Sequence, residues 1–131
     1  RQPWSGFTHN MVFEIQLDTT EPRQLTQSVL QIIAMLDMYQ AELARVLQLQ
    51  CSDIGELSAA QRCLDRGSPS WEQAQLFVRF YQLLYGRMNA DGVAMRHWLR
   101  KHHPVLGNTP HLLIVDEGRL AEVVSHLEHT D

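Results

Sequence analysis

Cysteine is scarce in this chain of 131 residues, which contains only Cys51 and Cys63. Two cysteines so far apart form neither a CxxC pair nor a disulfide framework, so we expect reduced thiols. No apolar run reaches the roughly 20 residues that a membrane-spanning helix needs. The N-terminal stretch also lacks the basic start and apolar centre of a signal peptide. These absences predict a cytoplasmic protein that does not enter a membrane.

An excess of basic residues is also missing. The formal net charge is −4, with 44% hydrophobic and 20% charged residues. Such a chain has no overall attraction to a phosphate backbone, so contact with DNA would need a local basic patch or a partner. The apolar share is that of a globular protein, and the length fits one domain or two small helical lobes that share a core.

Catalytic and metal-binding motifs are absent. There is no GxSxG elbow, P-loop or Rossmann glycine pattern, and the adjacent carboxylates of Asp116 and Glu117 are poorly placed for acid/base work. Four of the seven histidines lie close in sequence, but without HxxxH, HExxH or cysteine spacing: His97, His102, His103 and His111. We therefore predict a binding protein that is not an enzyme and that has no metal and no cofactor.

The N-terminal extension, residues 1–19, has a pattern of its own. Met11, Phe13, Ile15 and Leu17 alternate with polar residues and Val12, which is typical of a half-buried strand. Its partner would be the same segment of a second subunit in a homodimer, or else the segment is a tail that lies on the core. The residues before Met11 are either an added remnant or a processed start.

From Thr20 onward the apolar spacing predicts an all-α fold. The prediction has a helical lobe over residues 20–69 and a second helical domain over 70–131. Ser70 and Gln73 have the spacing of a capping box, and Asp91 and Thr109 are further expected helix starts. The expected helices cover 22–37, 40–47, one or two short stretches within 52–65, 71–85, a stretch after Asp91 that ends before Pro104, 111–115 and the residues after Gly118.

Residues 39–57 are similar to an Xre-type helix-turn-helix motif. Ala44 is small enough to let a second helix cross closely, and Ile54 and Leu57 would hold that helix. Asp53 and Glu56, however, are unfavourable on a helix that must face phosphates. The alternatives are a DNA-binding motif and a plain packed lobe. The candidate DNA-binding residues are Gln40, Arg45, Gln50, Ser52 and Arg62.

The segment from Trp98 to Leu127 resembles the toxin-binding domain of Xre/MbcA/ParS-type antitoxins. It contains a Trp-Leu pair, a loop with Leu-Gly and Thr-Pro, a short leucine helix, a glycine, and a final helix with valine and leucine. The residues that carry this pattern are Trp98, Leu99, Gly107, Thr109, Pro110 and Gly118. The resemblance implies a bacterial protein that binds and neutralises a toxin of the RES type, which consumes NAD, and that in some cases represses its own operon by binding operator DNA.

The candidate partner-binding residues lie in or just before a basic turn, residues 100–103, and on the last helix. They are Arg96, Arg100, Lys101, His102, His103, His126, Glu128 and His129. The basic turn would attract an acidic partner, or its cations would only complement the end of their own helix. Two other functions stay open: a transcriptional regulator whose C-terminal half dimerises, and an adaptor for an unrelated protein.

Overall fold

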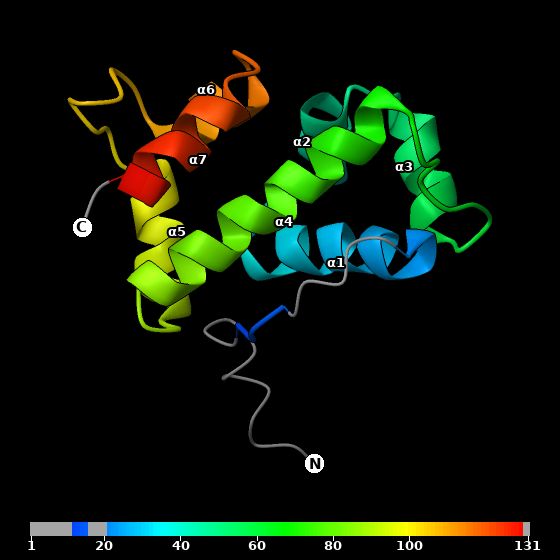
Figure 1. Cartoon of the computed structure of the whole chain (residues 1–131), viewed down its shortest axis with the longest axis horizontal. Helices are drawn as coiled ribbons and strands as arrows, with labels where there is room; N and C mark the ends of the chain where they lie inside the picture. Colours follow the sequence, from blue (N-terminus) through cyan, green and yellow to red (C-terminus); the bar gives the residue numbers. More distant parts are fainter. Residues whose placement is uncertain (1–11, 16–20, 130–131) are drawn as a thin grey trace.

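The chain forms an all-α fold in the computed structural model, which describes residues 12–15 and 21–129 (Figure 1). No strand occurs among these residues, so the predicted all-α class is confirmed. The helices are α1 (Pro22–Met35), α2 (Gln40–Leu47), α3 (Cys51–Ser58), α4 (Pro69–Arg87), α5 (Gly92–Arg100), α6 (Pro110–Val115) and α7 (Leu120–His129).

Helix α1 shows how local chemistry sets a helix start. The carboxylate of Glu21 accepts hydrogen bonds from the backbone N–H groups of Arg23 and Gln24 at 3.2 and 2.8 Å. Pro22 occupies the first turn, where its missing N–H group costs nothing. The apolar stripe that begins at Leu25 is buried, as the spacing predicts.

Helix α4 begins earlier than predicted. Ser68, and not Ser70, is the N-cap, and its hydroxyl accepts a hydrogen bond from the N–H of Trp71 at 3.2 Å. Pro69 explains the difference, because its fixed φ and missing N–H suit the first helical position. Ser70 is buried inside the first turn, and the Gln73 amide donates to the Val46 carbonyl of α2 at 3.1 Å instead of closing a capping box.

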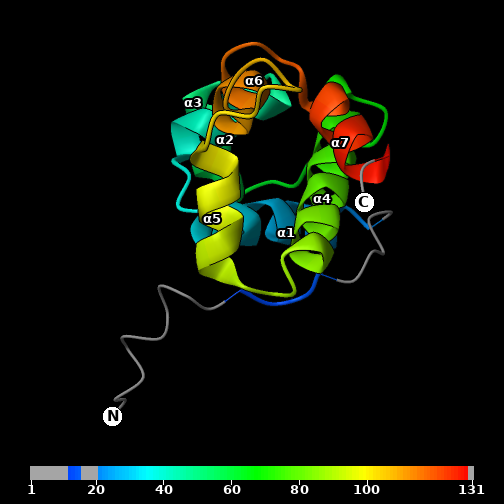
Figure 2. The same ribbon diagram turned by 90° about the vertical axis from the view of Figure 1, so that its left-hand side faces the viewer.

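Helix α4 is the central element. It packs against α1, α2, α5 and α7, and Figure 2 shows it opposite α5, with α6 above and α1 below. Phe77, Phe80, Tyr81 and Leu84 have no exposed surface. The buried apolar residues of all seven helices form one cluster, so the core continues across the predicted boundary between residues 69 and 70.

The described part of the N-terminal extension, residues 12–15, is a tail on the core and not a strand. Ile15 is buried, and the carbonyls of Phe13 and Ile15 accept hydrogen bonds from Tyr81 Oη at 2.6 Å and Gln82 Nε2 at 2.8 Å. Burial raises the pKa of the Tyr81 hydroxyl, which therefore stays a donor. The two side chains replace the neighbouring strand that the alternation predicted. The rest of that prediction lies outside the described residues.

No helix in the described part of the chain is both long enough and apolar enough to cross a membrane.

Candidate functional site

The segment from Trp98 to Leu127 is built from α5, a turn, α6 and α7. Asp91 caps α5 by accepting a hydrogen bond from the N–H of Ala94 at 3.2 Å, as predicted. Thr109 and Pro110 begin α6. Gly118 has φ +67° between α6 and α7, a conformation that glycine adopts without a steric cost.

Trp98 and Leu99 attach this segment to α4. Leu99 is fully buried, and the half-buried Trp98 ring lies 6.4 Å from the Phe80 ring, between centroids. On its other side the Trp98 ring lies 4.8 Å from the His103 ring. The tryptophan therefore links the core to the turn that follows α5.

The α5–α6 turn, residues 103–108, is closed by its own backbone. The carbonyl of His103 accepts hydrogen bonds from the N–H groups of Leu106 at 3.0 Å and Gly107 at 2.9 Å. His103 N–H donates to the Asn108 carbonyl at 3.2 Å, and the pair forms an isolated antiparallel bridge. Gly107 has φ +84°, which a side chain would resist. The turn is thus a defined structure that stands clear of the helices (Figure 1).

Two predicted partner-binding residues, Arg96 and Arg100, bind the end of α1. Arg96 Nη1 donates to the Met35 carbonyl at 2.9 Å, and its Nε lies 3.7 Å from Asp37 Oδ2. Arg100 Nη2 donates to the Asp37 carbonyl at 2.7 Å. The Arg96 side chain is only 14% exposed. The structure thus gives both guanidinium groups intramolecular partners, and Arg96 offers little surface to another protein.

The other basic-turn candidates differ in exposure. Lys101 and His102 are exposed, whereas His103 is half-buried, with its Nε2 3.0 Å from the Trp98 carbonyl. Lys101 and His102 are therefore accessible to a partner, whereas His103 attaches the turn to Trp98 of α5.

The candidates on α7 lie near its C-terminal end. Glu128 forms an ion pair with Arg79 of α4 at 3.2 Å, and His129 Nδ1 lies 2.8 Å from the carbonyl of Ser125. His126 is half-buried. Glu128 therefore contributes to the attachment of α7 to α4, whereas the His129 contact lies within α7. The partner-binding role of all three residues stays a prediction.

His126 lies in a basic environment. Burial lowers its pKa from the ordinary value of 6.5, and the charges of Arg87 and His103 lower it further. These effects outweigh the opposite effect of the C-terminal end of α7, which favours the protonated, cationic form of histidine.

We expect acid to destabilise the fold through His126. A lowered pKa in the folded state means that the unfolded chain binds the proton first, so stability is complete above pH 6.5 and declines as the pH falls below it. Urea unfolding at several pH values between pH 5 and pH 8, about 1.5 units to either side of the ordinary histidine pKa, measures the slope of the free energy of unfolding against pH. His126→Gln should flatten this slope, whereas His102→Gln, at an exposed residue, is the control. An unchanged slope in His126→Gln would contradict this account.

Helices α2 and α3 have the arrangement of two helices joined by a short turn. The turn contains Gln48 in the left-handed region, φ +63°, and its N–H donates to the Arg45 carbonyl at 3.3 Å. The two helices pack against each other, and Ala44, Ile54 and Leu57 are buried. The sequence predicted these burial positions.

The candidate DNA-binding residues are engaged within the chain to different degrees. Gln40 donates to Ser58 Oγ at 3.3 Å, and the N–H of Gln50 donates to Asp53 Oδ2 at 2.9 Å, which caps α3. Ser52 is exposed in the first turn of α3. Arg45 forms an ion pair with Asp116 at 3.0 Å.

Arg62 is surrounded by carboxylates. Its Nη1 lies 2.9 Å from Asp53 Oδ1 and 3.3 Å from Glu56 Oε1, and its Nη2 lies 3.9 Å from Asp65 Oδ2. The hydrogen bond to Glu56 is the main cause that raises the pKa of Arg62. Three acidic groups around one guanidinium leave little positive potential for a phosphate.

An imidazole–carboxylate contact and an ion pair join α2 to α6 and its C-terminal cap, and the sequence predicted neither of them. His111 Nε2 lies 2.6 Å from Glu42 Oε2, and Arg45 lies against Asp116. Glu42 Oε1 also accepts the N–H of Tyr39 at 2.9 Å. No sequence spacing relates Glu42 to His111, so the structure was needed to find the pair.

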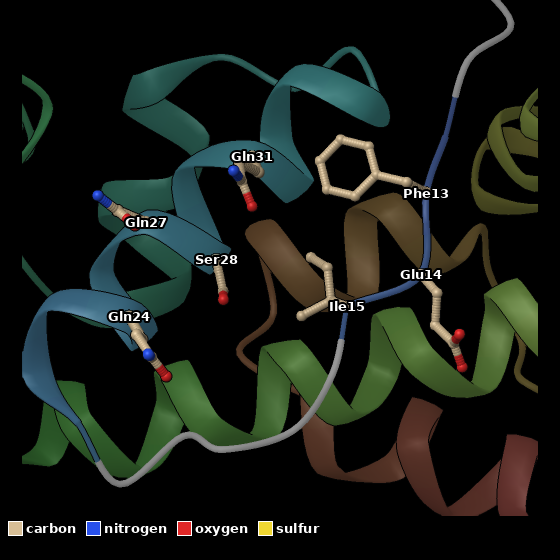
Figure 3. Close-up of a pocket in the computed structure, with 7 residues that line it drawn as sticks. All are labelled: Phe13, Glu14, Ile15, Gln24, Gln27, Ser28 and Gln31. Carbon is tan, nitrogen blue, oxygen red and sulfur yellow. The ribbon is translucent and has the colours of Figure 1, made fainter.

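The described surface has two pockets of note. One of about 200 Å³ lies between residues 13–15 and the polar face of α1, where Gln24, Gln27, Ser28 and Gln31 line it (Figure 3). A larger one of about 440 Å³ lies between α1 and the end of α3, with Leu30, Leu57, Arg23 and Arg62 among its lining residues.

No group of three or more metal-ligating side chains is found within residues 12–15 and 21–129. No family model matches the chain, and no curated protein matches it.

Proposed function

We propose that this chain is an antitoxin-like protein that binds and neutralises a partner toxin of the RES type, which consumes NAD. The observation that carries the proposal is the folding of residues 98–127 into α5, a hydrogen-bonded turn, α6 and α7. Gly107 and Gly118 occupy left-handed conformations there, and Thr109 and Pro110 begin a helix. The antitoxin-like pattern has its glycines and its Thr-Pro pair where these geometries are needed.

The surface of the unit also supports protein binding. Lys101 and His102, which lead into its turn, are exposed, and Val105 within the turn is 83% exposed. A binding loop on a rigid helical scaffold is a common arrangement for recognition. Neutralisation by direct binding needs no catalytic group in this chain.

Co-expression with the protein encoded by the neighbouring reading frame tests the proposal. We expect the two proteins to form a stable complex on size-exclusion chromatography. We also expect the chain to relieve the growth arrest that the neighbouring protein causes when it is expressed alone. Lys101→Glu should weaken the complex, and Arg23→Glu, the same charge reversal at an exposed residue of α1, is the control. A neighbouring protein that neither binds nor loses toxicity overturns the proposal.

The second candidate is a homodimeric DNA-binding regulator. The arrangement of α2 and α3 favours it, whereas the carboxylates around Arg62 and the Arg45–Asp116 ion pair oppose it. A mobility shift on upstream DNA whose affinity falls steeply with salt would favour this function. A shift with the complex but not with the free chain would indicate avidity from several weak copies of the motif.

A further inference from the structure

The α5–α6 turn has an apolar residue at its apex. Val105 is 83% exposed, more than any other large hydrophobic residue in the described part of the chain. Turn apices usually carry glycine, asparagine, aspartate or serine, which suit the backbone and are well solvated. A β-branched apolar residue breaks this local rule without any packing gain inside the chain, and such a departure points to a function.

The apex is held in place from three directions. The His103 carbonyl accepts two backbone N–H groups of the turn, as described above. The His103 ring lies on Trp98, and Asn108 Nδ2 donates to Glu117 Oε2 at 3.1 Å. Pro104 further restricts the backbone just before the apex. A loop ordered in advance loses little conformational entropy when it binds, so its apolar tip can contribute fully to affinity.

The residues that lead into the turn are basic and exposed. Lys101 and His102 are exposed, and Arg100 keeps an exposed side chain although it donates to the Asp37 carbonyl. The whole chain has a net charge of −4, so this is a local reversal of sign. An apolar tip with a basic side is complementary to an apolar socket that has carboxylates on one rim.

We infer that the α5–α6 turn inserts Val105 into an apolar socket of a partner protein, while Lys101 and His102 face acidic residues at the rim of that socket. This inference rests on the proposed function, since it names the part of the chain that the partner holds. Val105 is the anchor, because a desolvated apolar group at the centre of an interface carries much of the binding energy. The rim charges mainly accelerate association.

The test compares two exposed valines in the full chain. Val105→Asp places a charge at the apex, and Val93→Asp places the same charge at a valine that is 53% exposed in the first turn of α5. The probe is the purified protein of the neighbouring reading frame, with binding measured by surface plasmon resonance. We expect Val105→Asp to raise Kd about 30-fold or more, and Val93→Asp to change it less than about threefold.

Two further variants distinguish the role of Val105 in the socket from the role of Lys101 at its rim. Val105→Ala should weaken binding through a faster off-rate, whereas Lys101→Glu should lower the on-rate and reduce its dependence on salt. Far-ultraviolet circular dichroism should be unchanged in each variant, because the altered side chains are exposed.

The outcomes distinguish this inference from the proposed function. If the unaltered chain binds the neighbouring protein and Val105→Asp binds it equally well, the inference is wrong and the proposed function stands. If the unaltered chain does not bind, the proposed function is wrong and the inference falls with it.

Discussion

We expect Phe80→Ala to lower the free energy of unfolding by about 3–5 kcal/mol, the range for removing a fully buried phenylalanine. Phe80 has no exposed surface, and its ring lies 6.1 Å from Phe77 and 6.4 Å from Trp98, between centroids. Removing it opens a cavity where α4 meets α5. It also removes the contact that holds Trp98, so the α5–α6 turn should lose order as well. Urea unfolding measures the first effect, and hydrogen exchange of the Leu106 and Gly107 amides measures the second.

Leu83→Ala is the matched control for Phe80→Ala. Leu83 is half-buried on the same helix, so its truncation should cost clearly less, about 1–2 kcal/mol. Equal losses in the two variants, or a loss below about 1.5 kcal/mol for Phe80→Ala, would show that Phe80 does not join α4 to α5 as described.

Much of this helical architecture follows from local sequence. The predicted bounds of α2, residues 40–47, are confirmed, and so is the capping of α5 by Asp91. Such features depend on apolar spacing and on side chains within one turn of the helix end, so the sequence contains the information. The predicted N-cap Ser70 was wrong by only two residues, because Pro69 starts α4 less than one turn earlier.

The features that were missed depend on residues far apart in the chain. The alternation at residues 12–15 indicated a strand, but the chain supplies Tyr81 and Gln82 as hydrogen-bonding partners in place of a neighbouring strand. In the same way, a run of basic residues around α5 indicated an exposed patch, and no local rule shows that the end of α1 lies beside Arg96. Long-range packing decides such cases.

Arg96 gives the second large effect, and it separates a structural role from a binding role. We expect Arg96→Met to lower the free energy of unfolding by about 1.5–3 kcal/mol, because the Met35 carbonyl loses a charge-assisted hydrogen bond. The cation also complements the C-terminal end of α1, where helix carbonyls lack partners of their own. Methionine keeps the aliphatic packing, so the measured loss reports on the guanidinium group. Urea unfolding at pH 8, about 1.5 units above the ordinary histidine pKa, keeps histidine titration out of the comparison.

Arg100→Met is the control for Arg96→Met, because Arg100 makes a similar bond to the Asp37 carbonyl but has an exposed side chain. Solvent competes with an exposed interaction, so we expect a loss below about 1 kcal/mol. If Arg96→Met instead kept its full stability and weakened only the complex with the partner protein, Arg96 would be a contact residue, as the sequence predicted. The burial of its side chain favours the first result, because only 14% of the Arg96 side chain is exposed to a partner.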